Sequence, residues 1–112
     1  MEAIARVRNL RGSARKARLI LDLIRGKTVP EAQQILLFSK KRVATSVAKL
    51  LNSAIANATI KEGKTNIDKM VVNKVFADDG PIMKRHRPRA HGRATVIRRR
   101  TCHITLEILG EE

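Results

Sequence analysis

One stretch decides how this chain must be built: MKRHRPRAHGRATVIRRR, which runs from Met83 to Arg100. It holds eight lysines and arginines, and no carboxylate occurs anywhere between Asp79 and Glu107. Because the stretch cannot neutralise its own charge, it needs an external polyanion. A phosphate backbone offers dense negative charge that arginine binds bidentately. The stretch therefore predicts a nucleic-acid contact.

The sequences on either side indicate two strands that this stretch connects. Thr101–Leu109 alternates apolar and polar residues, which is typical of a strand with one buried face. Its apolar positions are Cys102, Ile104, Leu106 and Ile108. Before the stretch, Met70–Ala77 is rich in β-branched residues, and we expect Met70, Val72 and Phe76 to face inward.

Between these strands, the sequence predicts a hairpin arm over residues 80–101. Symmetry between the flanking strands places its tip at Arg89-Ala90, and the turn formers Pro88 and Gly92 bracket that point. About 11 residues on each side, at about 3.3 Å per residue, give a reach of roughly 35 Å. Isolated two-stranded ribbons are marginally stable, so we expect the partner to order the arm. A loose, solvated loop is the alternative.

The rest of the sequence predicts one more strand and three helices. The expected elements are a strand over 2–8, a helix over 13–25 capped by Ser13, a helix over 28–38 with capping-box spacing at Thr28 and Glu31, and a helix over 39–61. The fold class is therefore α+β, with three helices packed on a small antiparallel sheet and a long protruding basic β-hairpin. We expect residues 1–112 to form a single domain.

Composition narrows the kind of partner. A net charge of +14 and a pI near 11.3 indicate nucleic acid or an anionic membrane surface. A membrane is disfavoured because no apolar run approaches the roughly 20 residues that span a bilayer, and no signal peptide is visible. The two aromatic residues, Phe38 and Phe76, are too few for a row of stacked bases. Recognition should therefore run through phosphate, sugar and shape, and the lone Cys102 fits a reducing cytosol.

Two groups of basic residues are expected to contact RNA, with a solvated face as the alternative for each. They are Arg6, Arg8, Arg11, Arg15, Lys16 and Arg18 near the N-terminus, and Lys84, Arg85, Arg87, Arg98, Arg99 and Arg100 in the arm. A third cluster, Lys40, Lys41 and Arg42, starts a helix where positive charge opposes the dipole, which leaves a phosphate partner and a solvated face equally open. The sequence shows no P-loop, metal-ligand spacing or thiolate pair, so we expect no enzyme, cofactor or metal.

Seven collinear segments resemble the bacterial family of large-subunit ribosomal protein L-twenty-two. They are Ala14–Leu19 (ARKARL), Asp22–Lys27 (DLIRGK), Ser53–Ala58 (SAIANA), Asp79–Pro81 (DGP), Met83–Arg85 (MKR), Arg87–Ala94 (RPRAHGRA) and Arg100–Thr105 (RTCHIT). Each segment alone is a weak signal, but the ordered set covers nearly the whole chain. His91 stands where lysine or arginine is usual in that family, and His86 where apolar residues are common.

The resemblance implies a domain on the outside of the large ribosomal subunit, with a hairpin that threads inward through rRNA. It implies a tunnel-lining tip formed by Arg89, Ala90, His91, Gly92 and Arg93. It also implies that Met83, Lys84 and Arg85 lie near the tunnel constriction, close to where macrolide antibiotics bind. The implied partners are large-subunit rRNA, neighbouring ribosomal proteins and the nascent peptide. The implied location is the cytoplasm, with no homo-oligomer.

Two other function classes fit part of the sequence. DNA-bending architectural proteins also use basic β-arms, but they typically intercalate apolar residues. The apolar candidates here, Ile82 and Met83, fall near the base of the arm. A basic regulatory protein that binds another protein would leave the arginine arm unexplained. DNA binding with a measurable bend, or strict dimerisation, would favour the architectural class.

Overall fold

The computed structural model describes residues 2–62, 67–88, 92 and 94–110. Its elements are β1 (Glu2–Arg11), α1 (Ala14–Ile24), α2 (Val29–Phe38), α3 (Arg42–Glu62), a short 3-10 helix (Ile67–Lys69), β2 (Val71–Asp79), β3 (Met83–Pro88), β4 (Ala94–Arg99) and β5 (Thr101–Leu109). This order confirms the predicted α+β fold class, with β3 and β4 forming a separate hairpin.

The first two helices begin at the residues that the sequence marks as caps. Ser13 Oγ accepts a hydrogen bond from the Lys16 N–H at 3.3 Å, and Thr28 Oγ1 accepts one from the Glu31 N–H at 3.4 Å. Each cap satisfies one N–H group that a helix start leaves without an intrahelical acceptor. Pro30 lies in the first turn of α2, where a missing N–H costs nothing.

The third helix begins later than predicted. The sequence predicts a helix from residue 39, but Ser39 follows the end of α2, and α3 starts at Arg42. The Ser39 hydroxyl accepts from the Lys41 N–H at 3.3 Å, which closes a tight turn before the helix can start. This turn fixes the short α2–α3 connection.

A three-stranded antiparallel sheet has the order β1-β5-β2, so the cleanly alternating C-terminal strand lies in the centre. Its register places Leu106 between Ala5 of β1 and Val75 of β2. Central strands pair on both sides and therefore depend most on a regular backbone. The alternation predicted for β5 is confirmed, since Cys102, Ile104, Leu106 and Ile108 are all buried.

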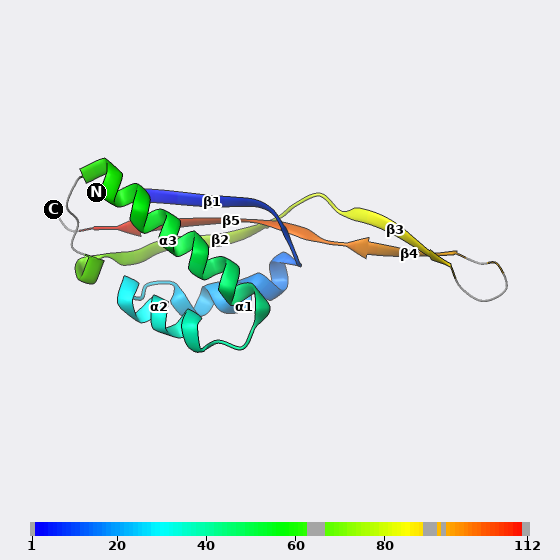
Figure 1. The fold of residues 1–112 in the computed structure, drawn as a ribbon, viewed down its shortest axis with the longest axis horizontal. Coiled ribbons are helices and arrows are strands. Elements are labelled where there is room, and N and C mark those ends of the chain that lie inside the picture. Colours follow the sequence, from blue (N-terminus) through cyan, green and yellow to red (C-terminus); the bar gives the residue numbers. More distant parts are fainter. Residues whose placement is uncertain (1, 63–66, 89–91, 93, 111–112) are drawn as a thin grey trace.

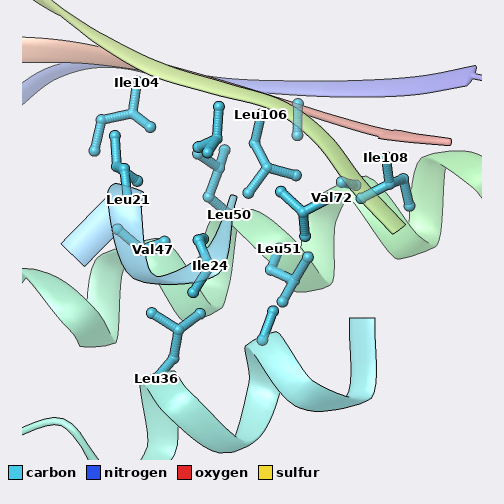
Figure 2. Packing of buried hydrophobic residues seen from close by; sticks show 14 of the residues in the cluster. Leu21, Ile24, Leu36, Val47, Leu50, Leu51, Val72, Ile104, Leu106 and Ile108 are labelled. Atoms are coloured by element: carbon cyan, nitrogen blue, oxygen red, sulfur yellow. The ribbon is translucent and has the colours of Figure 1, made fainter. Parts of the chain in front are cut away.

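The helices cover one face of this sheet, and their apolar side chains meet the strands there (Figure 2). Leu21 and Ile24 come from α1, Leu36 from α2, and Val47, Leu50 and Leu51 from α3; they pack with Val72, Ile104, Leu106 and Ile108. Full burial of one such side chain stabilises the fold by about 1.5–3 kcal/mol. The core is entirely aliphatic apart from Met70 and Cys102, because both phenylalanines of the chain lie outside it.

The predicted inward face of β2 is partly wrong. Met70 and Val72 are buried as expected, but Phe76 is 44% exposed, while Val75 and Ala77 are buried. The strand pairing shifts register between Val72 and Lys74, which is a β-bulge. A bulge inserts one extra residue, so every side chain beyond it changes face. The alternation rule therefore holds on each side of the bulge and fails across it.

The hairpin β3–β4 extends the molecule well beyond the sheet and helices (Figure 1). The principal extents are 65 × 25 × 16 Å, and the radius of gyration is 17.2 Å, against about 13 Å for a compact domain of this length. The hairpin pairs Met83 with Arg99 at its base and Pro88 with Ala94 at its outer end. The predicted tip at Arg89-Ala90 lies outside the described residues.

Candidate nucleic-acid interface

Three segments of the sequence contain cations but no carboxylate at all: residues 3–21, 32–61 and 80–106. They supply most of the 24 lysines and arginines. The first segment forms β1 and most of α1, the second covers most of α2 and α3, and the third holds the hairpin. Whole helices and strands of the fold therefore carry positive charge without neighbouring acids in the sequence.

The predicted N-terminal group lies on two adjoining elements. Arg6, Arg8 and Arg11 are exposed on β1, and Arg15 and Lys16 are exposed on the first turns of α1. The turn between these elements is joined to the arm, because the Gly12 N–H donates to the Arg100 carbonyl at 2.9 Å. Along the long axis of the molecule, β1 ends and α1 begins at the end from which the hairpin projects (Figure 1). The N-terminal cations and the base of the arm thus occupy the same end of the molecule.

Arg18 has a structural contact that the sequence interpretation missed. Its Nε and Nη2 atoms donate to the Ala77 carbonyl at 3.2 and 2.8 Å, so its guanidinium binds the free edge of β2. Arg25 does the same at Val75, donating at 2.7 Å, and also pairs with Asp22 at 2.6 Å. Arg18 is therefore less available to RNA than Arg15.

Side chains donate to carbonyl groups at both edges of the sheet. Arg18 lies within α1, and Arg25, seven residues later, is the residue that caps the C-terminal end of this helix. Both side chains reach the edge strand β2, where they donate to carbonyl groups two residues apart. Side chains of α3 also bind carbonyl groups of β1, the strand at the other edge of the sheet. Asn57 Nδ2 donates to the Ile4 carbonyl at 2.9 Å, and Lys61 Nζ donates to the Glu2 carbonyl at 3.0 Å. Side chains that occupy edge carbonyls protect a sheet from pairing with other chains.

The base of the arm is held by a compact set of hydrogen bonds. The Gly80 N–H donates to the Thr101 carbonyl at 2.9 Å, and the Thr101 hydroxyl donates to the Pro81 carbonyl at 2.6 Å. Thr101 is buried, and a Cβ at Gly80 would lie 2.6 Å from its Oγ1 atom. Glycine is therefore required at position 80 by close approach and not by a positive φ. These contacts fix the direction in which the arm leaves the sheet.

A bulge in β1 adds a further contact at the same place. Asn9 has a φ of 58°, and its N–H donates to His103 Nδ1 at 3.1 Å. The acceptor nitrogen must be unprotonated, so this imidazole carries its proton on Nε2 when neutral. His103 therefore connects β1 to β5 beside the arm.

In the hairpin itself, Lys84, Arg99 and Arg100 are exposed, and Lys84 is the direct cross-strand partner of Arg98. Like charges at directly opposed positions destabilise a strand pair. The side chains of Met83, Arg85, Arg87 and Arg98 lie outside the described residues, as do four of the five predicted tip residues, Arg89, Ala90, His91 and Arg93. Gly92 is exposed with a φ of 71°, which suits its predicted turn position.

Other kinds of site find no support in the described part of the chain. Within residues 2–62, 67–88, 92 and 94–110, no group of three or more His, Cys, Asp or Glu side chains could hold a metal ion. None of the helices described is long and apolar enough to cross a membrane. The Cys102 thiol is buried, and burial raises its pKa, with Asp79 adding to the effect and Arg18 opposing it. A buried thiol with a raised pKa is unreactive, in agreement with its predicted place in the core.

Comparison with protein families gives one match. The model of the family described as ribosomal protein L22p/L17e matches residues 5–108, which include all the strands and helices above except the outermost residues of β1 and β5. Members of this family are structural, rRNA-binding components of the large ribosomal subunit and function in translation. The chain therefore belongs to the ribosomal protein L22p/L17e family.

Proposed function

We propose that this protein holds several segments of large-subunit rRNA together, supports subunit assembly and lines the nascent-peptide exit tunnel with the tip of its arm. The observation that supports this most directly is the acid-free hairpin, which projects from a basic end of the molecule and lengthens it to 65 Å. An arm of this shape can pass between RNA segments, whereas the globular part can bind only at a surface.

The binding mechanism is replacement of counterions along the phosphate backbone. Exposed cations on β1, α1 and the hairpin displace ions that would otherwise neutralise RNA, so affinity falls as salt concentration rises. If the eight cations between Lys84 and Arg100 all met phosphates, the slope of log K against log salt would be roughly −6 to −7. Bound phosphates would also remove the repulsion between Lys84 and Arg98. Free protein therefore has a less stable arm than bound protein.

The base of the arm fixes the direction of the hairpin relative to the sheet. The Gly80–Thr101 and Thr101–Pro81 hydrogen bonds lie where the three-stranded sheet passes into the hairpin. They set the direction of the arm before RNA binds, so that binding does not have to order that junction. RNA then orders the outer part, where the cations are concentrated.

The finer roles follow from the resemblance. Arg89–Arg93 form the tunnel-lining tip, and Met83–Arg85 lie near the constriction where macrolides bind. The arm and the N-terminal group bind different rRNA segments, and neighbouring ribosomal proteins and the nascent peptide are further partners. The protein acts in the cytoplasm as a single copy within the subunit, with no catalytic role, cofactor or metal.

Deletion of residues 89–93 tests whether the globular part folds and enters the subunit independently of the tip of the arm. We expect the variant to fold, because the aliphatic core is built from residues of the three-stranded sheet and the helices. It should enter large subunits but lose photocrosslinks to a nascent chain stalled in the tunnel. A second variant, in which residues 89–93 are replaced by glycine and serine, keeps the wild-type length and is the control for hairpin closure. Loss of helical circular dichroism after the deletion would contradict a modular arm.

A further inference from the structure

The only two aromatic side chains of this protein are both left outside its core, and one of them is almost fully exposed. Phe38, the last residue of α2, is 79% exposed, and Leu37 beside it is 77% exposed. Residues of this size and polarity are usually buried, and a contiguous exposed pair indicates a contact surface. The helix itself does not need them, since α2 packs through Val29, Ala32 and Leu36.

Three cations follow this apolar pair without interruption by acid. Lys40, Lys41 and Arg42 are all exposed, and the hydrogen bond from the Lys41 N–H to Ser39 Oγ holds the connection that carries them. The surrounding sequence contains no carboxylate from residue 32 to residue 61. The surface formed by Leu37, Phe38 and Lys40–Arg42, here called the α2–α3 corner, therefore combines an exposed ring with unneutralised positive charge.

This charge pattern favours RNA as the occupant. The centre of a protein interface is depleted in charged residues, whereas the α2–α3 corner places three exposed cations beside its apolar pair. Along the long axis of the molecule, α3 begins toward the end from which the arm projects, as does α1 (Figure 1). The corner can thus contact RNA that also approaches the N-terminal cations.

We propose that Phe38 stacks on an unpaired base of the bound rRNA, while Leu37 packs against the adjoining sugar and Lys40, Lys41 and Arg42 bind the neighbouring phosphates. This inference rests on the proposed rRNA-binding function and adds a base contact to it. One exposed ring can hold one base, which differs from the multi-base aromatic platforms of single-strand binders. The corner thus supplies a fixed point on single-stranded RNA, in addition to the phosphate contacts of β1, α1 and the arm.

The test compares substitutions that separate ring stacking from apolar contact. The full chain and in vitro transcribed large-subunit rRNA are used, and small-subunit rRNA measures non-specific binding. Phe38→Leu keeps an apolar side chain and should weaken large-subunit rRNA binding by about 5- to 150-fold, the usual contribution of one stacked base. Phe38→Tyr keeps the ring and should stay within about twofold of wild type. Ile60→Ser removes another exposed apolar side chain, 83% exposed on α3, and should have no effect.

Nucleotide-resolution chemical probing of the same complexes identifies the base. Wild type and Phe38→Tyr should protect one unpaired nucleotide that Phe38→Leu leaves reactive. Replacing Lys40, Lys41 and Arg42 by glutamine should reduce the salt slope by about 2 to 3. Equal affinity of wild type and Phe38→Leu overturns the stacking proposal, even where Phe38→Leu impairs entry into subunits, since that result indicates a protein contact. Failure of the wild type to prefer large-subunit rRNA would instead refute the proposed function itself.

Discussion

Gly80→Ala should destabilise the protein through one atom, the hydroxyl oxygen of Thr101. The new Cβ would lie 2.6 Å from Thr101 Oγ1, well inside van der Waals contact. The next nearest atoms, Cε1 and Nε2 of the His103 ring, lie at 3.2 and 3.3 Å, which small movements can accommodate. Gly80 does not have a positive φ, so alanine brings no backbone strain. The threonine hydroxyl must move, and its hydrogen bond to Pro81 is lost.

The magnitude follows from what that hydroxyl does. Thr101 is 4% exposed and its hydroxyl donates at 2.6 Å, so displacement leaves a buried polar group unsatisfied, at a cost of about 1–3 kcal/mol. Replacing glycine by alanine also restricts the unfolded chain, which stabilises by about 0.4–1 kcal/mol. The net loss for Gly80→Ala is therefore about 0–2.6 kcal/mol. In a Thr101→Ala background the clash is absent, and Gly80→Ala should be neutral or slightly stabilising.

Urea unfolding of the full chain, followed by far-ultraviolet circular dichroism, measures this double-mutant cycle. The coupling free energy between Gly80 and Thr101 should be about 1–3 kcal/mol. Gly26→Ala is the matched control, because Gly26 has a φ of 79° and open space around its Cβ. Its cost should come from backbone strain and be the same in both backgrounds. An equal cost of Gly80→Ala with and without the Thr101 hydroxyl would refute the close-approach argument.

Three further predictions concern charge and the thiol. Arg18→Met should lower the free energy of unfolding, measured in urea, by about 1 kcal/mol, because it removes two hydrogen bonds to β2. Arg15→Met should leave that free energy unchanged and weaken rRNA binding, measured by filter binding. A larger loss of stability for Arg15→Met than for Arg18→Met would contradict these assignments. Replacing Arg98–Arg100 by glutamine should reduce the salt slope of rRNA binding by about 2 to 3, and an unchanged slope would exclude phosphate contacts there. The Cys102 thiol should resist alkylation in the native protein, and rapid labelling would show instead that the thiol is accessible. The free energy of unfolding should fall as pH rises above about 8.5, because the thiol ionises there only in the unfolded chain.

The sequence predicted those features that depend on regular periodicity. The alternation from Cys102 to Ile108 correctly identified a buried strand face. Ser13 and Thr28 correctly marked helix starts, because capping is a local interaction between residues three apart. Periodic and local signals survive folding because tertiary contacts reinforce them.

The errors arise where one irregular residue or one long-range contact decides the outcome. The bulge between Val72 and Lys74 turned Phe76 to the surface, and bulges depend on pairing with a distant strand. The RNA contact of Arg18 stays a prediction, but its contact with the Ala77 carbonyl was missed because it joins residues 59 apart in sequence. For the binding groups, sequence correctly located the charge, but which cations also support the fold depended on tertiary structure.

Ultraviolet crosslinking in growing cells tests the central claim most directly, with sequencing of the attached nucleic acid and mapping of the attached peptides. The account predicts that large-subunit rRNA dominates, and that peptides from β1 and α1 crosslink to rRNA segments different from those attached to the hairpin. Crosslinks confined to the hairpin, with DNA or mixed messenger RNA attached, would contradict a threaded rRNA-binding protein and favour a DNA-bending or general nucleic-acid-binding role.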